Sequence, residues 1–146
     1  MKWVTVAWLG ACAAVLTGCG SDDERVVLTD AGRLCLLAEE PVGSPALNAP
    51  QDYQADERLY AVVEVGGGSC EENRVFTCST SLAGSTLTVT SEYAYDRSDE
   101  MCDAMATMRT TTCTTDPLPA ADYTVVYGPE DYPLTIPSTR PEACFP

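Results

Sequence analysis

Four carboxylates lie close together in one polar stretch of the chain, and they are the residues best able to do chemistry. They are Asp96, Asp99, Glu100 and Asp103. Two carboxyls with separated pKa values could act as acid and base in the hydrolysis of a glycan, and carboxylate oxygens also bind calcium. The stretch lacks the glycine and the alternating Asp/Asn spacing of an EF-hand loop. We therefore expect a solvated acidic loop over residues 96–103, with calcium binding and carboxylate-based hydrolysis as alternatives.

The residue types that usually activate a nucleophile or hold a metal are nearly absent. The chain has no histidine, and its one lysine is Lys2. Without these residues the common bases for Ser, Thr or Cys nucleophiles are missing. Imidazole metal sites and phosphate-binding Gly-Lys-Ser/Thr loops are missing as well. The composition excludes most enzyme classes, so we predict that the chain is not an enzyme and uses no cofactor.

The N-terminal segment carries the most specific motif. An uncharged stretch follows Lys2 and closes with Leu16-Thr17-Gly18-Cys19, before charge arrives at Asp22. Its roughly 17 residues are marginal for a membrane-spanning helix, which needs about 20, but they suit the apolar region of a signal peptide. A plain signal-peptide cut at Ala11-Cys12-Ala13 is an alternative. Leu9-Gly10-Ala11-Cys12 is a second possible lipobox, although a cut there would leave a very short apolar region and an apolar Val15-Leu16 tail.

This segment resembles the lipobox signal peptides of bacterial lipoproteins over the first 19 residues. The resemblance implies cleavage before Cys19, a diacylglyceryl thioether on its sulfur and an acylated new N-terminus. Stable anchoring takes more than one chain, and such an anchor supplies two or three. Gly20 and Ser21 stand where an aspartate would indicate retention in the inner membrane. The implied location is therefore the bacterial envelope, on the outer membrane, with the lipid anchor contacting the bilayer.

Cleavage at this point divides the chain into three parts. Residues 1–18 are the predicted signal peptide, 19–25 the lipidated cysteine with an acidic tether, and 26–146 a single domain. Removing 18 of 146 residues leaves 128, in which 22 acidic residues face seven arginines, a formal charge of −15. That size suits one domain. The charge disfavours nucleic acid and indicates a solvated surface, with a cation or cationic partner as the alternative.

Six cysteines remain for pairing once Cys12 is removed and Cys19 carries lipid. They are Cys35, Cys70, Cys78, Cys102, Cys113 and Cys144. The envelope is oxidising and no Cys-x-x-Cys occurs, so we expect three disulfides and no metal site. Sequence leaves the connectivity open. The short spacings favour Cys70–Cys78 and Cys102–Cys113, and Cys35–Cys144 would then tie the two ends of the domain together.

Short β-like runs separated by turn residues fill most of the domain. The runs at 26–28 and 34–37 predict a hairpin across Asp30–Gly32. A proline-containing loop is expected over residues 39–57, and further strands over 59–65, 74–80, 86–95 and 109–115. Met101, Ala104, Met105 and Met108 have helical spacing and predict one or two helical turns packed in the core. The regular alternation of strands and turns favours an all-β antiparallel sandwich.

One stretch near the C-terminus is more diagnostic of the fold. Tyr123 opens an alternating strand, five residues after Leu118 and four after Pro119. This resembles the tyrosine corner of immunoglobulin-like and fibronectin type III-like sandwiches, in which the hydroxyl hydrogen-bonds to upstream backbone. Residues 132–136 would form the final strand, paired with this one across a tight turn. The chain lacks the tryptophan of antibody-type domains, and an unrelated small β-barrel is the alternative.

These features favour a membrane-anchored envelope lipoprotein that acts as a non-catalytic binding or structural module. Its partner would be an envelope protein, a glycan or a cation, contacted through the loops. A carboxylate-based hydrolase using residues 96–103 is the rival hypothesis. It requires two carboxyls about 5–10 Å apart in a cleft.

Overall fold

The computed structural model describes residues 24–97 and 106–146, and in this part of the chain all regular structure is β-strand. The strands are β1 (Arg25–Thr29), β2 (Arg33–Leu37), β3 (Gln51–Tyr53), β4 (Tyr60–Gly67), β5 (Glu71–Ala83), β6 (Thr86–Arg97), β7 (Thr107–Thr114), β8 (Ala121–Tyr127), β9 (Glu130–Ile136) and β10 (Ser138–Arg140). Within these ranges no helix is long and apolar enough to cross a membrane. The prediction of an all-β fold is confirmed.

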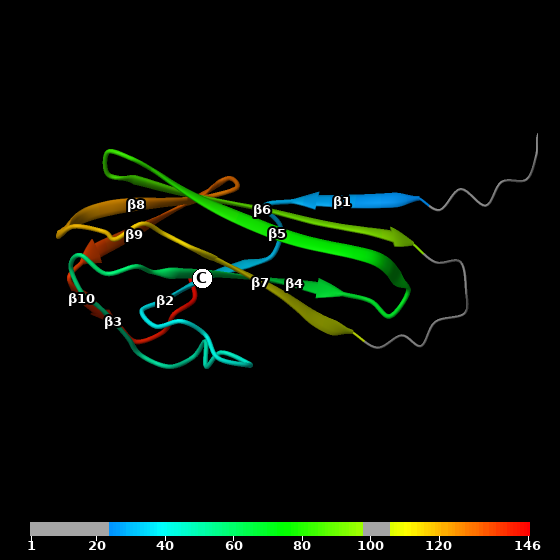
Figure 1. Cartoon of the computed structure of the whole chain (residues 1–146), viewed down its shortest axis with the longest axis horizontal. Coiled ribbons are helices and arrows are strands. Elements are labelled where there is room, and N and C mark those ends of the chain that lie inside the picture. Colours follow the sequence, from blue (N-terminus) through cyan, green and yellow to red (C-terminus); the bar gives the residue numbers. More distant parts are fainter. Residues whose placement is uncertain (1–23, 98–105) are drawn as a thin grey trace, which may run out of the picture.

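The strands form two facing layers, a sandwich-like arrangement (Figure 1). One layer is a five-stranded sheet in the order β1-β6-β8-β9, with β5 on the other edge of β6. The second layer is the three-stranded sheet β2-β4-β7, and β10 pairs with β3 as a separate two-stranded ladder. Buried side chains from both layers meet in one core, which includes Leu36 and Val63 from one sheet and Val89, Val125 and Ile136 from the other.

Strand β6 is the centre of the larger sheet. Its first half, from Thr86 to Val89, pairs in parallel with β8, and its second half, from Glu92 to Asp96, pairs antiparallel with β1. The alternation of residues 86–95 matches the burial pattern over most of this strand, because successive side chains point to opposite faces. The sequence predicts only antiparallel pairing, so the parallel β6–β8 ladder is a correction.

The predicted hairpin across Asp30–Gly32 is wrong. Strand β1 pairs with β6 and strand β2 pairs with β4, so the chain crosses from one sheet to the other between them. Asp30 fixes the crossing, because its amide donates to the Ser91 carbonyl oxygen at 2.9 Å and its carboxylate accepts from the Ser91 amide at 2.7 Å. Turn residues indicate a sharp change of direction, but they do not say which strand is met next.

A second, smaller cluster of buried side chains covers the outer face of β2 and β4. It comprises Cys35, Leu37, Leu47, Val62, Ala143 and Cys144. Because this cluster lies opposite the main core, four consecutive residues of β2 are buried. This outer face is buried by residues of the loop after β2 and by the last residues of the chain, whose end lies beside β2 in Figure 1.

Two disulfides are present among the described residues. Cys35–Cys144 is the expected bridge between the two ends of the domain, with its Cα atoms 3.8 Å apart. The other joins Cys78 to Cys113, with Cα atoms 5.6 Å apart. The predicted pairs Cys70–Cys78 and Cys102–Cys113 are therefore wrong. Cys70 is not a free thiol, and Cys102 lies outside the described residues. Of the three predicted pairs the structure confirms Cys35–Cys144, and it describes two disulfides where three are expected.

The physical reason for this correction is the extended backbone of β5. Cys70 precedes the strand and Cys78 lies within it, so eight extended residues place them about 25 Å apart, far beyond the reach of a disulfide. Strand β5 instead lies beside β7 of the other sheet, where the Thr111 hydroxyl donates to the Phe76 carbonyl oxygen at 3.2 Å. The bridge joins these two edge strands.

The residues around Tyr123 adopt the expected local geometry. The Tyr123 hydroxyl donates to the Pro119 carbonyl oxygen at 2.8 Å, and β8 forms an antiparallel hairpin with β9. Strand β9 is not the final strand, because β10 follows it and pairs with β3. Met108 lies in β7 with 61% of its surface exposed, so its predicted place in a helical core segment is wrong. The other residues of that predicted helix lie outside the described ranges.

Candidate functional site

Of the acidic residues proposed for chemistry, the structure describes Asp96. It lies near the end of β6, where its carboxylate accepts hydrogen bonds from Asn73 and Arg25, each at 2.8 Å. These two partners lower the pKa of Asp96, the Asn73 hydrogen bond most strongly. The carboxylate is thus held in a surface ion pair. Asp99, Glu100 and Asp103 lie outside the described residues, as does the predicted lipidation site Cys19.

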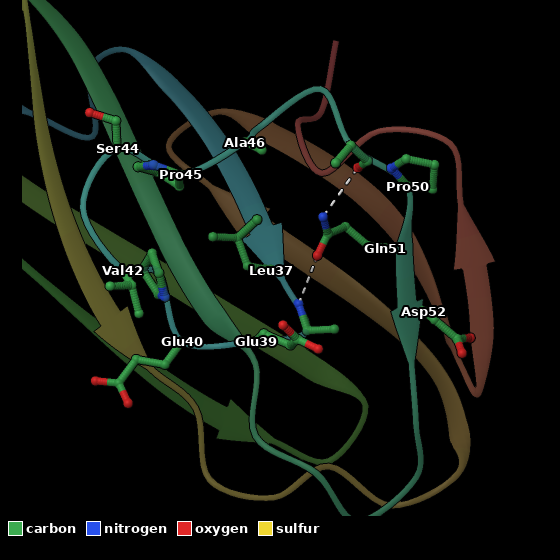
Figure 2. A pocket seen from close by; sticks show the side chains of 13 residues that line it. Leu37, Glu39, Glu40, Val42, Ser44, Pro45, Ala46, Pro50, Gln51 and Asp52 are labelled. Atoms are coloured by element: carbon green, nitrogen blue, oxygen red, sulfur yellow. Dashed lines mark hydrogen bonds between the residues drawn. The ribbon is translucent and has the colours of Figure 1, made fainter.

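A hollow beside the loop between β2 and β3 is a candidate binding site. This loop pocket has a volume of about 590 Å³ and is lined by the ends of the two strands and by the loop over residues 38–50 (Figure 2). A connection of this length without regular structure is uncommon in a compact domain, and such loops are often functional. Neither the pocket nor its residues are singled out by the sequence, where the region reads as a plain surface loop.

The loop is fixed at both of its ends by the side chain of Gln51, a residue with 9% of its surface exposed. Its Oε1 accepts from the Ala38 amide at 3.0 Å, and its Nε2 donates to the Ala49 carbonyl oxygen at 3.1 Å. Both bonds are visible in Figure 2. One amide therefore connects the start of the loop to its last turn, because it provides a donor and an acceptor on the same group.

The middle of the loop is held by the second hydrophobic cluster. Leu47 is buried there, and its carbonyl oxygen accepts from the Ala143 amide at 3.2 Å. The Cys35–Cys144 disulfide lies in the same cluster. Pro41, Pro45 and Pro50 further restrict the loop backbone. The hydrophobic cluster that contains the disulfide therefore holds the loop in place, and the pocket is preformed.

The lining of the pocket is apolar in its centre and acidic at its edge. Figure 2 shows Leu37 at the centre with Glu39 below it, and Glu40 and Asp52 at opposite outer edges with their carboxylates directed away from the centre. No arginine among residues 24–97 and 106–146 lines the pocket. Among the described residues, no group of three or more acidic or cysteine side chains is arranged to hold a metal ion. The pocket can therefore offer apolar contact and negative charge, without a metal-ligand set.

A buried polar cluster that the sequence does not predict lies at the other end of the sandwich. The Glu71 carboxylate accepts a hydrogen bond from the Tyr93 hydroxyl and one from the Gly68 amide, the latter at 2.9 Å, and it lies 3.8 Å from Arg109 Nε. Burial and the neighbouring carboxylate raise the pKa of Tyr93, against the opposing effect of Arg109. A β-carbon on Gly67 would lie 2.7 Å from Glu71 Oε2, so the cluster requires glycine at this position, but the glycine run does not indicate which glutamate is buried. Glu71 and Tyr93 are buried in this cluster, whereas 28% of the Arg109 side chain is exposed.

Near the C-terminus, the Phe145 ring contacts both Arg140 and Tyr132. The Arg140 guanidinium lies 4.2 Å from the centre of the Phe145 ring, and Tyr132 stacks on that ring with centroids 4.4 Å apart. Such stacks add stability beyond the burial of area. They cover one end of the main core.

No protein-family model matches this chain, and no curated protein or solved structure matches it either. The chemistry of the loop pocket is thus the basis on which its ligand class can be inferred.

Proposed function

We propose that this chain is a lipid-anchored, non-catalytic binding module of the bacterial cell envelope, held on the outer membrane, and that the loop pocket is its binding site. One observation carries the proposal: a long loop without regular structure is held rigidly by Gln51 and by a disulfide-supported cluster around Leu47. A loop fixed on a rigid scaffold is the usual place for a binding surface. Preformed pockets also lose less conformational freedom on binding.

The anchor is supported by Leu16-Thr17-Gly18-Cys19 and by the two disulfides, which suit an oxidising compartment. The tether from Cys19 to Arg25 spans about 20 Å at full extension. The domain would therefore stay close to the membrane. The Tyr123–Pro119 hydrogen bond supports assignment to the immunoglobulin-like class of sandwiches.

The rival hypothesis of a hydrolase or calcium site at residues 96–103 receives less support. Asp96 is the member of that group that the structure describes, and its carboxylate is already bound to Arg25 and Asn73. An ion-paired carboxylate is a poor candidate for the protonated acid that such hydrolysis requires.

The anchor can be tested by growing a Gram-negative host that expresses the full chain with an alkyne-tagged palmitate. The native chain and a Cys12→Ser control are expected to carry the label and to sediment with the outer membrane. A Cys19→Ser variant should lose the label and leave the membrane fraction. Label that persists in Cys19→Ser would overturn the proposed anchor.

A further inference from the structure

We infer that the loop pocket receives an extended cationic peptide segment of a partner protein, in which Lys or Arg side chains flank an apolar one. This inference rests on the proposed binding function and names its class of partner. It draws on the charge around the pocket, on its apolar centre and on its rigidity.

The charge around the pocket has one sign. Glu39, Glu40 and Asp52 line it, and no basic residue in the described part of the chain does. A neighbouring hollow shares Glu39 and Glu40 and adds Glu57 together with Arg58. The excess of carboxylates therefore extends along the surface, and the formal charge of the whole chain is −14. The electrostatic field of this negative charge attracts cationic partners and raises their association rate. The same field repels nucleic acid and anionic lipid.

The arrangement of these carboxylates favours ammonium or guanidinium groups over a bare metal ion. Glu40 and Asp52 stand at opposite outer edges of the hollow in Figure 2, with their carboxylates directed away from its centre, and the described acidic residues form no metal-ligand group. Asp52 also accepts a hydrogen bond from the Thr139 hydroxyl at 3.1 Å, which holds it in place. Separated carboxylates suit separate side chains on one segment, because each can accept hydrogen bonds from its own cation.

The centre of the pocket suits an apolar side chain between those cations. Leu37 lies at the centre with 6% of its surface exposed, and Pro45 and Pro50 contribute apolar surface on either side of it. Val42 stands at the edge with 92% of its surface exposed. A bound side chain that covered this valine would make binding more favourable by about 25 cal/mol for each Å² of apolar surface removed from water. The fixed loop loses little freedom when this happens.

The test uses the lipidated full chain, purified in a neutral detergent, and a fluorescein-labelled hexapeptide with the sequence Arg-Pro-Leu-Arg-Pro-Leu. Binding is followed by fluorescence polarisation. A variant that combines Glu39→Gln, Glu40→Gln and Asp52→Asn is expected to weaken binding about tenfold or more. A control that combines Asp116→Asn, Glu130→Gln and Asp131→Asn removes the same charge from exposed positions outside the pocket. It should weaken binding less than about twofold.

Two further measurements separate this site from general attraction to an acidic protein. Val42→Ser, at an exposed position that cannot unfold the domain, is expected to weaken binding about two- to threefold. The hexapeptide with Glu in place of Arg should not bind. Equal weakening by the two triple variants, or no binding of the Arg peptide to the native chain, would overturn the inference. Palmitate labelling at Cys19 does not depend on either binding result. A negative peptide-binding result would therefore overturn the proposed cationic partner and leave the proposed lipid anchor standing.

Discussion

Gly32 lies so close to the carbonyl oxygen of Glu64 that a β-carbon at position 32 would stand 2.0 Å from it. Gly32 also has a φ of 95°, in the region that side chains rarely adopt. This contact lets the chain pass from β1 in one sheet to β2 in the other. We expect Gly32→Ala to lower the free energy of unfolding by about 3 kcal/mol or more, measured by urea unfolding followed by circular dichroism.

Gly84→Ala is the matched control for this prediction. Gly84 has a φ of 61° in the turn between β5 and β6, but a β-carbon there would meet nothing within 4 Å. Backbone strain alone should cost about 1 kcal/mol. Equal losses for the two variants would show that the contact with Glu64 contributes nothing.

The fold could be predicted from sequence where side chains alternate within one strand, and less well where two strands have to be matched. Residues 86–95 indicate both the strand and its buried face, because alternation is a local property. The crossing at Gly32 and the parallel pairing of β6 with β8 depend on contacts between distant residues. Asp30 and Gly32 favour a turn equally whether the chain forms a hairpin within one sheet or crosses to the other sheet, so they do not distinguish the two.

The candidate site could not be predicted because its parts are ordinary in the sequence. Gln51 is one polar residue in a loop, and its two hydrogen bonds appear only once β2 and β3 are placed. Glu71 stands beside Glu72 with nothing to distinguish the two, yet one is buried and the other exposed. Burial of a carboxylate is decided by the packing of the two sheets, which no local pattern encodes.

The two described disulfides should differ in their reactivity. Cys35 and Cys144 are buried, at 0% and 7% exposure, whereas Cys78 and Cys113 are partly exposed in edge strands. Thiol–disulfide exchange requires access to a sulfur atom. Under native conditions a reductant should therefore open Cys78–Cys113 first, and iodoacetamide labelling with peptide mapping would detect this.

The same experiment in about 6 M guanidinium chloride is the control, since both bridges are then accessible and should be reduced together. Early labelling of Cys35 in the native protein would contradict the prediction. A non-reducing digest should also contain a Cys70–Cys102 peptide, because these two remain unassigned among the six cysteines expected to pair after cleavage before Cys19.

Replacement of the buried carboxylate at Glu71 should destabilise the domain. Glu71→Gln removes the charge that faces Arg109 and alters the acceptor of the Tyr93 hydroxyl. Breaking a buried ion pair leaves the charge of the remaining partner uncompensated. Because the Arg109 side chain is partly exposed to solvent, we expect the free energy of unfolding to fall by about 2 kcal/mol. Glu72→Gln, at an exposed neighbouring position, should change the unfolding free energy by less than about 0.5 kcal/mol. Similar effects of the two variants would contradict a stabilising role for the cluster.

Burial of Tyr53 should make the fold sensitive to alkaline pH. The hydroxyl donates to the Leu36 carbonyl oxygen at 2.9 Å, and burial raises the pKa of Tyr53 from 10.0 to about 12 against the opposing effect of Arg140. Below pH 10 the group is protonated in both states, so its contribution is fully present. As the pH rises from 10 to 12, the unfolded chain loses the proton and the folded chain keeps it, so stability falls by on the order of 2 kcal/mol. In Tyr53→Phe the loss of the hydrogen bond should cost about 1 kcal/mol at pH 8, and the decline above pH 10 should be shallower. Parallel curves for the native chain and the variant, measured by urea unfolding at each pH, would show that Tyr53 is not the group responsible.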